Sequence, residues 1–538
     1  MKLLTDGTYS LEVDNRLLQL TKKGKETFVS EEEFKTALKG YKLDEFLAVL
    51  ADLSIKLYDP KFTEDNIWRK ERTGFIVHKL SQQWVTNFSI EYIADIVLIS
   101  GSNNFKKESI KNKDNIIDLF NIYNNLILEP INQITSAQSL LVPIYYQQIP
   151  SQRDIKDTLV RQWLIFQTSQ ELVDEKSKLD LDAILLEKSG MTVMEYVKLC
   201  FLILAVIIEN PRFNFGTFAK SSISGMNDVL NNAKISAILK QLSITPIKFT
   251  ELDEKFNVKL KPEYTRSKYN PLWEKPIIIL GENDYIVPSI SAYVKGALNG
   301  LYWIFENAKG KTFRDYFGKV FEKYCGLIIN DIFGEKNVRP EIKFGNKDQH
   351  FFDWIVNSND EILLFETKGY QFSLDTLQTG DEECINKAVS QDLVETIKQM
   401  YLRCQDISKY KELELFRDKK KTAIGVFYDI PLVSTNMYDT YIQFALNELD
   451  LKYPGIKDFK YIFLSIEELE NYYCVKNYIS INALVDRVKN TPGAGILSEV
   501  DKISKENDQS TEKCKSLLNR KFKDFYNNEL GIVYPGTG

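Results

Sequence analysis

The apolar residues between positions 350 and 369 follow the pattern of two successive β-strands. A short polar run, Asn357 to Asp360, separates them as a hairpin turn would. Side chains alternate between the two faces of a strand, so Glu366 and Lys368 point the same way at the end of the second strand. Ile362 to Phe365 supply apolar residues to both faces, which is typical of a central strand covered on both sides. The pattern therefore predicts a buried strand that carries a carboxylate and an ammonium group at its end.

Helical periodicity flanks this pair of strands. Residues Thr312 to Phe333 form an apolar stripe at helical spacing, with Thr312 as the N-cap, and Glu383 to Ser408 form a second stripe. Two further apolar runs predict strands at Val338 to Phe344 and at Thr422 to Tyr428. The predicted order is therefore helix, three strands, helix, strand.

Most of the remaining chain has helical patterns. They dominate from Ser30 to about Leu204, and a pair of short strands is expected at Pro276 to Leu280 and Tyr285 to Val287. We therefore predict an α/β fold class, α+β overall, in four parts. These are a mostly helical N-terminal domain (1–208), a connector with short strands and a helix (209–306), an α/β domain (307–487) and a polar helical C-terminal tail (488–538).

Length and composition allow large cores and exclude several classes of protein. The chain has 538 residues, of which 44% are hydrophobic and 12% aromatic, so it does not belong to the intrinsically disordered proteins. Its notable apolar run, Leu199 to Ile208, is too short to span a bilayer. The N-terminal residues lack the pattern of a signal peptide. We therefore expect a cytoplasmic protein that has no membrane partner.

Histidines and cysteines argue against several kinds of site. The sequence has two histidines, and neither belongs to a HExxH zinc motif or lies near a nucleophile motif. The six cysteines form no CxxC pair, which argues against zinc ribbons and iron–sulfur clusters of the usual spacing. We expect them to be reduced and mostly structural. Gly310-Lys311-Thr312 lacks the first glycine of a phosphate-binding loop, so any NTP-driven motor would be another protein.

Charged residues on two adjacent predicted strands are the strongest candidates for chemistry. Asp353 lies on the first strand of the pair, and Glu366 and Lys368 lie on the second. Two carboxylates can hold a hard divalent cation such as Mg²⁺. A lysine can orient a water molecule or stabilise charge on a phosphate. The alternative is a β-hairpin that ends in a surface ion pair between Glu366 and a lysine.

At these residues the sequence resembles the PD-(D/E)XK nuclease superfamily. The signature of that superfamily is an Asp on one strand of a hairpin, followed by Glu-x-Lys on the next, and Phe352-Asp353 stands here in place of its Pro-Asp pair. The resemblance covers roughly Lys311 to Tyr473 and implies a restriction endonuclease-like α-β-β-β-α-β core. It also implies Mg²⁺ as cofactor, for which Mn²⁺ can substitute. The implied ligands are Asp353, Glu366 and the backbone of Thr367, and the implied catalytic lysine is Lys368.

The resemblance assigns two further residues on the flanking helices. In many members a Glu on the first helix contacts the metal or its water, and Glu322 stands at the matching position. The alternative for Glu322 is a solvated flank of the helix. Some relatives place a Gln at the start of the following helix, near the active site, and Gln391 matches it. The Tyr that usually follows is missing, because Glu395 occupies its place.

The implied activity is hydrolysis of phosphodiester bonds, in DNA rather than RNA, by an endonuclease of bacterial antiphage defence or restriction. The net charge of −6 is unfavourable for a nucleic-acid partner, but basic residues cluster at Lys309 to Lys323 and at Lys419 to Lys421. Ordinary solvated faces would look the same. The helical N-terminal part would read the substrate or bind a protein partner, either another subunit or a second copy. Two alternatives remain: a non-catalytic nucleic-acid-binding or assembly subunit that keeps the nuclease fold, and a ribonuclease directed at tRNA.

Overall fold

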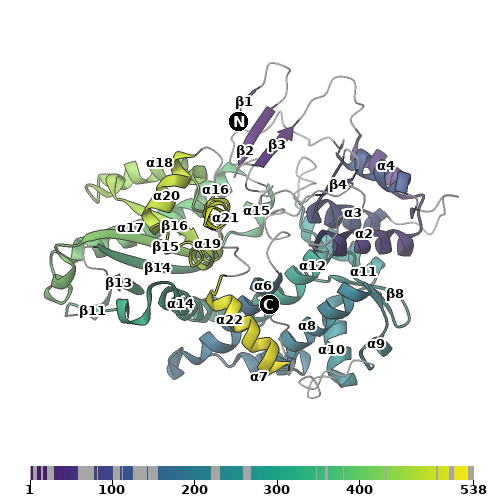
Figure 1. Cartoon of the computed structure of the whole chain (residues 1–538), viewed down its shortest axis with the longest axis horizontal. Helices are drawn as coiled ribbons and strands as arrows, with labels where there is room; N and C mark the ends of the chain where they lie inside the picture. The colour runs from purple at the N-terminus through teal and green to yellow at the C-terminus, as the bar shows by residue number, and fades with distance from the viewer. Residues whose placement is uncertain are drawn as a thin grey trace.

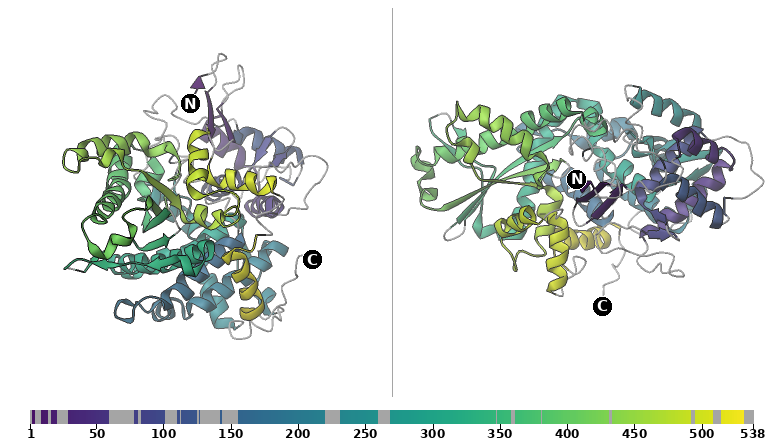
Figure 2. Two further views of the ribbon diagram at one scale, coloured as in Figure 1. Left: turned by 60° about the vertical axis from the view of Figure 1, so that its left-hand side comes forward. Right: turned by 90° about the horizontal axis from the view of Figure 1, so that it is seen from above.

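The computed structural model is a mixed helix-and-sheet protein, in agreement with the predicted α/β class (Figure 1). One lobe holds a five-stranded sheet, and the other holds the N-terminal helices α2 (Leu43–Tyr58) and α3 (Asn87–Ser100). The view from above in Figure 2 shows the same two lobes. The structure describes residues 2–3, 9–13, 16–20, 29–58, 78–80, 83–100, 110–111, 113–124, 126, 142, 155–219, 231–258, 268–346, 348–357, 361–379, 381–430, 433–491, 495–507 and 514–530.

The five-stranded sheet is mixed in direction. Its strands are, in spatial order, β10 (Val338–Pro340), β13 (Trp354–Asn357), β14 (Glu361–Gln371), β15 (Lys420–Asp429) and β16 (Tyr461–Ser465). The first three pair antiparallel, whereas β14, β15 and β16 pair parallel. Helix α14 (Lys311–Phe333) precedes the sheet, and a long helical segment separates β14 from β15. The predicted order of helix, three strands, helix and strand is therefore confirmed.

Strand β14 is covered on both faces, as its apolar pattern predicts. Leu363 and Phe365 belong to the core that also contains helix α14. Ile362 and Leu364 belong to a second core, which contains helix α17 (Glu395–Asp406). A strand buried on both faces has little freedom to shift, so the charged residues that follow Phe365 are held at a fixed position at the end of the sheet.

The first strand and the first helix of this part of the chain differ from the prediction at their boundaries. The first strand of the sheet ends at Pro340 instead of Phe344, because proline has no N–H with which to continue a ladder. Residues 343–344 pair instead with residues 349–350 as a separate small hairpin. Thr312 is not the N-cap of α14, since the helix already begins at Lys311 and Gly310 (φ 52°) occupies the capping position. The predicted turn at Asn357 to Asp360 lies, beyond its first residue, outside the described residues.

The helix expected from Glu383 to Ser408 consists of three joined segments. Helix α16 (Glu382–Ala388) leads into a π-helical turn, η11 (Val389–Val394), which leads into α17. A π-helical turn contains more residues than an α-helical one, so it rotates the residues after it relative to those before it. The turn therefore decides which residues of α17 face the end of β14.

The largest apolar core crosses the predicted domain boundaries. It contains Leu159 of α6 (Ile155–Trp163), Tyr196 of α8 (Val193–Glu209), Phe317 of α14, Val426 of β15 and Phe525 near the C-terminus. Figure 1 shows α6 and α8 next to the sheet lobe, below the N-terminal helices. The division at residues 208, 306 and 487 stays a prediction, and the parts that it separates share one core.

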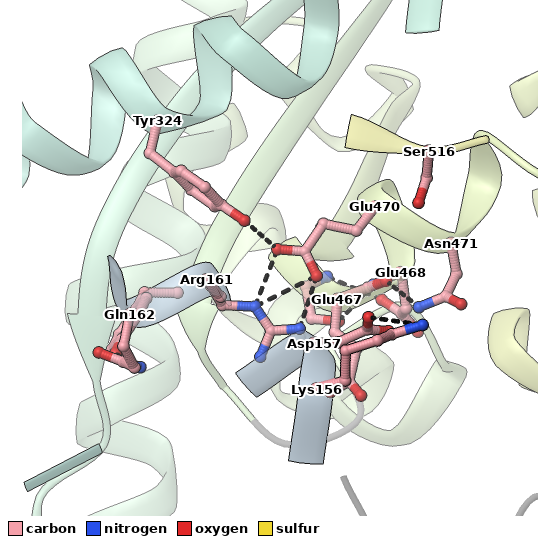
Figure 3. A network of polar contacts seen from close by, with 12 residues as sticks. Lys156, Asp157, Arg161, Gln162, Tyr324, Glu467, Glu468, Glu470, Asn471 and Ser516 are labelled. Atoms are coloured by element: carbon pink, nitrogen blue, oxygen red, sulfur yellow. Dashed lines mark hydrogen bonds and ion pairs between the residues drawn. The ribbon is translucent and has the colours of Figure 1, made fainter. Parts of the chain in front are cut away.

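Arg161 of α6, Tyr324 of α14 and Glu470 of α19 (Ile466–Tyr472) form a buried triad within this core (Figure 3). Arg161 Nε donates to Glu470 Oε1 at 2.8 Å, and Arg161 Nη2 donates to Glu470 Oε2 at 2.5 Å. The Tyr324 hydroxyl donates to Glu470 Oε1 at 2.6 Å. Burial disfavours the positive charge of Arg161, but the carboxylate of Glu470 outweighs burial and holds the pKa of Arg161 well above its ordinary value. The triad thereby fastens a helix of the N-terminal part to two elements around the sheet.

The predictions for short strands and for the apolar helix are confirmed. The strand pair is β8 (Ile277–Gly281) and β9 (Asp284–Ile286), which belong to a separate four-stranded sheet. The apolar run lies in α8, whose N-terminus has a capping box. Within the described part of the chain, no single helix is long and apolar enough to cross a membrane. The bent pair of α7 (Leu181–Ser189) and α8 meets the length and composition criteria together.

The expectation that all cysteines are reduced is wrong for one pair. Cys474 and Cys514 form a disulfide, which joins the end of the α19 region to the segment before helix α22 (Leu517–Asp524). The sequence did not indicate this pair, since 40 residues separate the two cysteines and no motif marks them. Four other cysteines are free, and Cys200 and Cys325 among them are buried, as expected for structural thiols.

Candidate active site at the end of strand β14

Asp353 lies beside the end of strand β14. The pairing of β13 with β14 matches Trp354 with Phe365, and the same register continued by one residue places Asp353 opposite Glu366. The backbone N–H and the hydroxyl of Thr367 both donate to Asp353 Oδ2, each at 2.7 Å. The hairpin therefore places the two acidic residues opposite each other on adjacent strands, as the sequence pattern predicts.

Glu366 has a cationic partner on each of its carboxylate oxygens. Lys368 Nζ lies 2.8 Å from Glu366 Oε1, and Arg403 Nη1 donates to Glu366 Oε2. Lys368 Nζ also donates to Gln399 Oε1 at 2.8 Å. The side chain of Glu366 is 3% exposed, so these partners offset the cost of burying its charge. We call Asp353, Glu366, Lys368, Gln399 and Arg403 the β14 charge cluster.

Asp353 experiences the negative charge of its neighbours. Burial, together with the carboxylates of Glu366 and Glu322, raises the pKa of Asp353 to about 8, against the hydrogen bonds from Thr367 that favour ionisation. Three acidic side chains therefore lie close enough together to disfavour the charged form of Asp353. A cation bound between them would have the opposite effect on that pKa, since opposite charge stabilises a carboxylate.

Glu322 is held near the cluster by a close contact between α14 and β13. The Trp354 Nε1 donates to the carbonyl oxygen of Glu322 at 2.9 Å. The Trp354 ring lies over Gly326, where any side chain would collide with it, since a Cβ would stand 2.0 Å from the indole. The Glu322 side chain is 26% exposed, and its carboxylate pairs with Lys323 at 2.7 Å. The negative charge of Glu322 contributes to the raised pKa of Asp353.

The chemistry of the donors fits a hard divalent cation. Mg²⁺ is commonly held by one or two carboxylates together with water and substrate phosphates. Asp353 and Glu366 supply such a pair. In the part of the chain that the structure describes, no three acidic, histidine or cysteine side chains surround a common metal position. Thr367, the expected backbone ligand, holds Asp353 through its N–H and hydroxyl. Asp353 and Glu366 are therefore the residues that would hold the ion.

Gln391 does not belong to the cluster. Its side chain is exposed in the π-helical turn η11, and Gln399 makes the contact with Lys368 instead. Gln399 and Arg403 are spaced i and i+4, so they project from the same side of α17. Their spacing was visible in the sequence. The position of that side relative to β14 was not visible, because the π-helical turn rotates α17 and periodicity gives no sign of it.

Exposed basic side chains lie on the first turns of α14, which packs against the face of β14 opposite to the one that carries Glu366 and Lys368. Gly369 of β14 lies against Phe317 and Gly318 of α14, where an added Cβ would be 3.0 and 3.6 Å from them. The first turns of α14 therefore continue past the charged end of β14. Their exposed basic side chains are Lys311, Arg314 and Lys319, and Lys309 precedes them. Arg314 among them pairs with Glu306.

Comparisons with known proteins add no assignment, because no protein-family profile and no curated protein matches the sequence.

Proposed function

We propose that this chain is a Mg²⁺-dependent endonuclease that hydrolyses phosphodiester bonds, with DNA as its substrate. The observation that carries the proposal is the position of Asp353, Glu366 and Lys368 at the ends of two paired strands. The sheet supports the finer assignment of a restriction endonuclease-like core. In support of it, an antiparallel β10–β13–β14 unit is followed by the parallel strand β15, which agrees with the order that the resemblance implies.

The residues of the cluster divide the work of hydrolysis. A water molecule loses a proton as its oxygen forms a bond to phosphorus, the bond from phosphorus to the leaving oxygen breaks, and the leaving oxygen takes up a proton, so that no proton is gained or lost overall. Lys368 Nζ, held by Glu366 and Gln399 at 2.8 Å each, orients the water or stabilises charge on the phosphate. Asp353 and Glu366 would hold Mg²⁺, which would supply positive charge to stabilise the transition state and activate water. Thr367 holds Asp353 in position through two hydrogen bonds.

The surroundings of the site suggest its context. By analogy with nuclease domains that carry large helical additions, we place the chain in the cytoplasm, in bacterial antiphage defence or restriction. The helical N-terminal part would bind the partner, which is a second protein subunit or another copy of the chain. The buried triad and the shared core would couple such binding to the sheet, because they join α6 to α14 and α19.

A non-catalytic nucleic-acid-binding or assembly subunit is the alternative function. The contact of Arg403 with Glu366 favours it, because a carboxylate with two cationic partners is also typical of a structural ion-pair network. Ribonuclease activity, on tRNA for example, uses the same chemistry as cleavage of DNA. Both alternatives are therefore arms of the test.

The test is incubation of the purified full-length chain with plasmid DNA, linear DNA and tRNA, each with Mg²⁺, Mn²⁺ or EDTA. We expect cleavage of DNA that requires the metal and disappears in Glu366→Gln. Binding of DNA without cleavage in any metal would favour the non-catalytic alternative. Cleavage of tRNA alone would change the substrate to RNA and leave the proposed site in place.

A further inference from the structure

Arg403 contacts the carboxylate that the proposed metal ion needs. Its Nη1 donates to Glu366 Oε2, while Lys368 occupies Oε1. Both oxygens of Glu366 are therefore hydrogen-bonded to cationic groups in a side chain that is 3% exposed. A divalent cation that binds Glu366 would stand next to the guanidinium of Arg403. Two cations on one buried carboxylate repel each other strongly, because little water screens them.

The guanidinium of Arg403 has two neighbours in this position, the carboxylate of Glu366 and the ring of Phe352. It lies on α17 one helical turn after Gln399, which holds Lys368 on the other oxygen of Glu366. Its guanidinium carbon lies 5.9 Å from the centroid of the Phe352 ring, at the outer limit of a cation–π contact. Phe352 directly precedes Asp353, so the aromatic residue beside the proposed metal site also supports the arginine. The side chain of Arg403 is 21% exposed, which leaves the guanidinium a path to the surface.

We propose that Arg403 is a positioning residue that exchanges partners. Without metal and nucleic acid it neutralises Glu366, and when both enter it leaves Glu366 and binds a phosphate of the substrate backbone. The inference rests on the proposed function. A guanidinium suits both roles, because its planar donors match carboxylate and phosphate oxygens equally well. The exchange would make metal binding weak in the absence of nucleic acid and would couple the two binding events.

The proposal is tested by binding measurements on the full-length chain. Mn²⁺ is titrated by electron paramagnetic resonance, with and without a DNA duplex whose phosphorothioate linkages resist cleavage. Arg403→Met removes the guanidinium and keeps an apolar stem. Arg403→Lys keeps a positive charge. Arg417→Met is the matched control, since Arg417 is an exposed arginine whose partner is Glu414. Thermal unfolding of each variant shows whether it is folded.

For Arg403→Met without DNA we expect Mn²⁺ to bind about tenfold more tightly than in the wild type, within the usual range of coupling between sites. We also expect DNA to tighten Mn²⁺ binding by a smaller factor in this variant than in the wild type. Arg403→Lys should keep the weak metal binding of the wild type and should bind the duplex less tightly, because an ammonium lacks the planar fork. Arg417→Met should match the wild type in every measurement.

Unchanged or weaker Mn²⁺ binding by folded Arg403→Met would overturn the exchange. If Arg403→Met does not fold, the decision rests on Arg403→Lys. Duplex binding as tight as in the wild type would then overturn the role of Arg403 as a phosphate ligand. Failure of the proposed function has a different signature: wild type and Asp353→Asn would bind Mn²⁺ equally poorly, with and without DNA. That result would remove the metal site and the exchange together.

Discussion

Removing Arg161 is expected to cost the protein much of its stability. Arg161→Met keeps the apolar stem but leaves the charge of Glu470, whose side chain is 2% exposed, with Tyr324 as its hydrogen-bond partner. Breaking a buried, hydrogen-bonded ion pair destabilises a protein by about 3–5 kcal/mol. Three hydrogen bonds join the Arg161 and Glu470 side chains, so we expect the upper part of that range. The loss should appear in the lobe that holds the sheet as well, because the triad includes helices α14 and α19.

The assay is urea unfolding of the full-length chain, followed by tryptophan fluorescence and circular dichroism. A double variant, Arg161→Met with Glu470→Leu, should recover most of the loss, because it leaves no buried charge without a partner. The control Arg417→Met removes an ion pair with Glu414 that is half exposed, and should change stability by about 1 kcal/mol or less. A cost of buried, unpaired charge at Glu470 would be refuted by Arg161→Met within about 1 kcal/mol of wild type, or by a double variant less stable than either single variant.

Three further predictions concern the β14 charge cluster and its neighbour Glu322. Lys368→Ala should lower kcat far more than substrate affinity, because the proposed role of the compact ammonium is in the transition state. Lys368→Arg should restore little of the activity. Normal single-turnover cleavage by Lys368→Ala would instead assign the lysine to anchoring a phosphate. Glu322→Ala should lower the cleavage rate less than Glu366→Gln does. Mn²⁺ should restore part of the rate, because it tolerates imperfect ligand sets better than Mg²⁺. An unchanged rate at limiting Mg²⁺ would assign Glu322 to a solvated flank of the helix. The metal-free protein should become less stable as the pH rises from about 4 to about 8, because the raised pKa of Asp353 means that its folded form keeps a proton that the unfolded form releases. Asp353→Asn should remove that part of the pH dependence. The measurement is the unfolding midpoint of wild type and of Asp353→Asn at pH 5 and at pH 8. The prediction is wrong if the two proteins differ by the same amount at both pH values.

The sequence predicted those features that depend on local pattern. Ile362 to Phe365 are apolar on both faces, which placed β14 in the middle of the sheet and so placed Glu366 and Lys368 at its end. The hairpin register then followed from the adjacent apolar strands and brought Asp353 to the same place. These residues were predictable because two neighbouring strands need only a short turn to align.

The missed features depend on geometry or on long-range contacts. The first is the rotation of α17 by the π-helical turn η11, which replaced Gln391 by Gln399 and Arg403. Apolar positions recur on both sides of such a turn, so periodicity alone does not show it. The prediction of Thr312 as the cap was wrong because Gly310 both ends the preceding helix and begins α14. Gly310 has a positive φ, which residues with a side chain adopt only with difficulty. The disulfide between Cys474 and Cys514 depends on how distant segments pack, which spacing does not reveal.

The most direct test of the central claim is the rate of plasmid cleavage by wild type and Glu366→Gln in Mg²⁺, with Glu414→Gln as an exposed-carboxylate control. Glu366→Gln removes one proposed metal ligand and keeps the size of the side chain. We predict that wild type and Glu414→Gln cleave at the same rate, that EDTA stops both, and that Glu366→Gln is inactive although folded. Loss of one metal-binding charge should remove several kcal/mol of transition-state stabilisation. Cleavage by folded Glu366→Gln at the wild-type rate would contradict the account, since no other pair of carboxylates has been assigned to the metal.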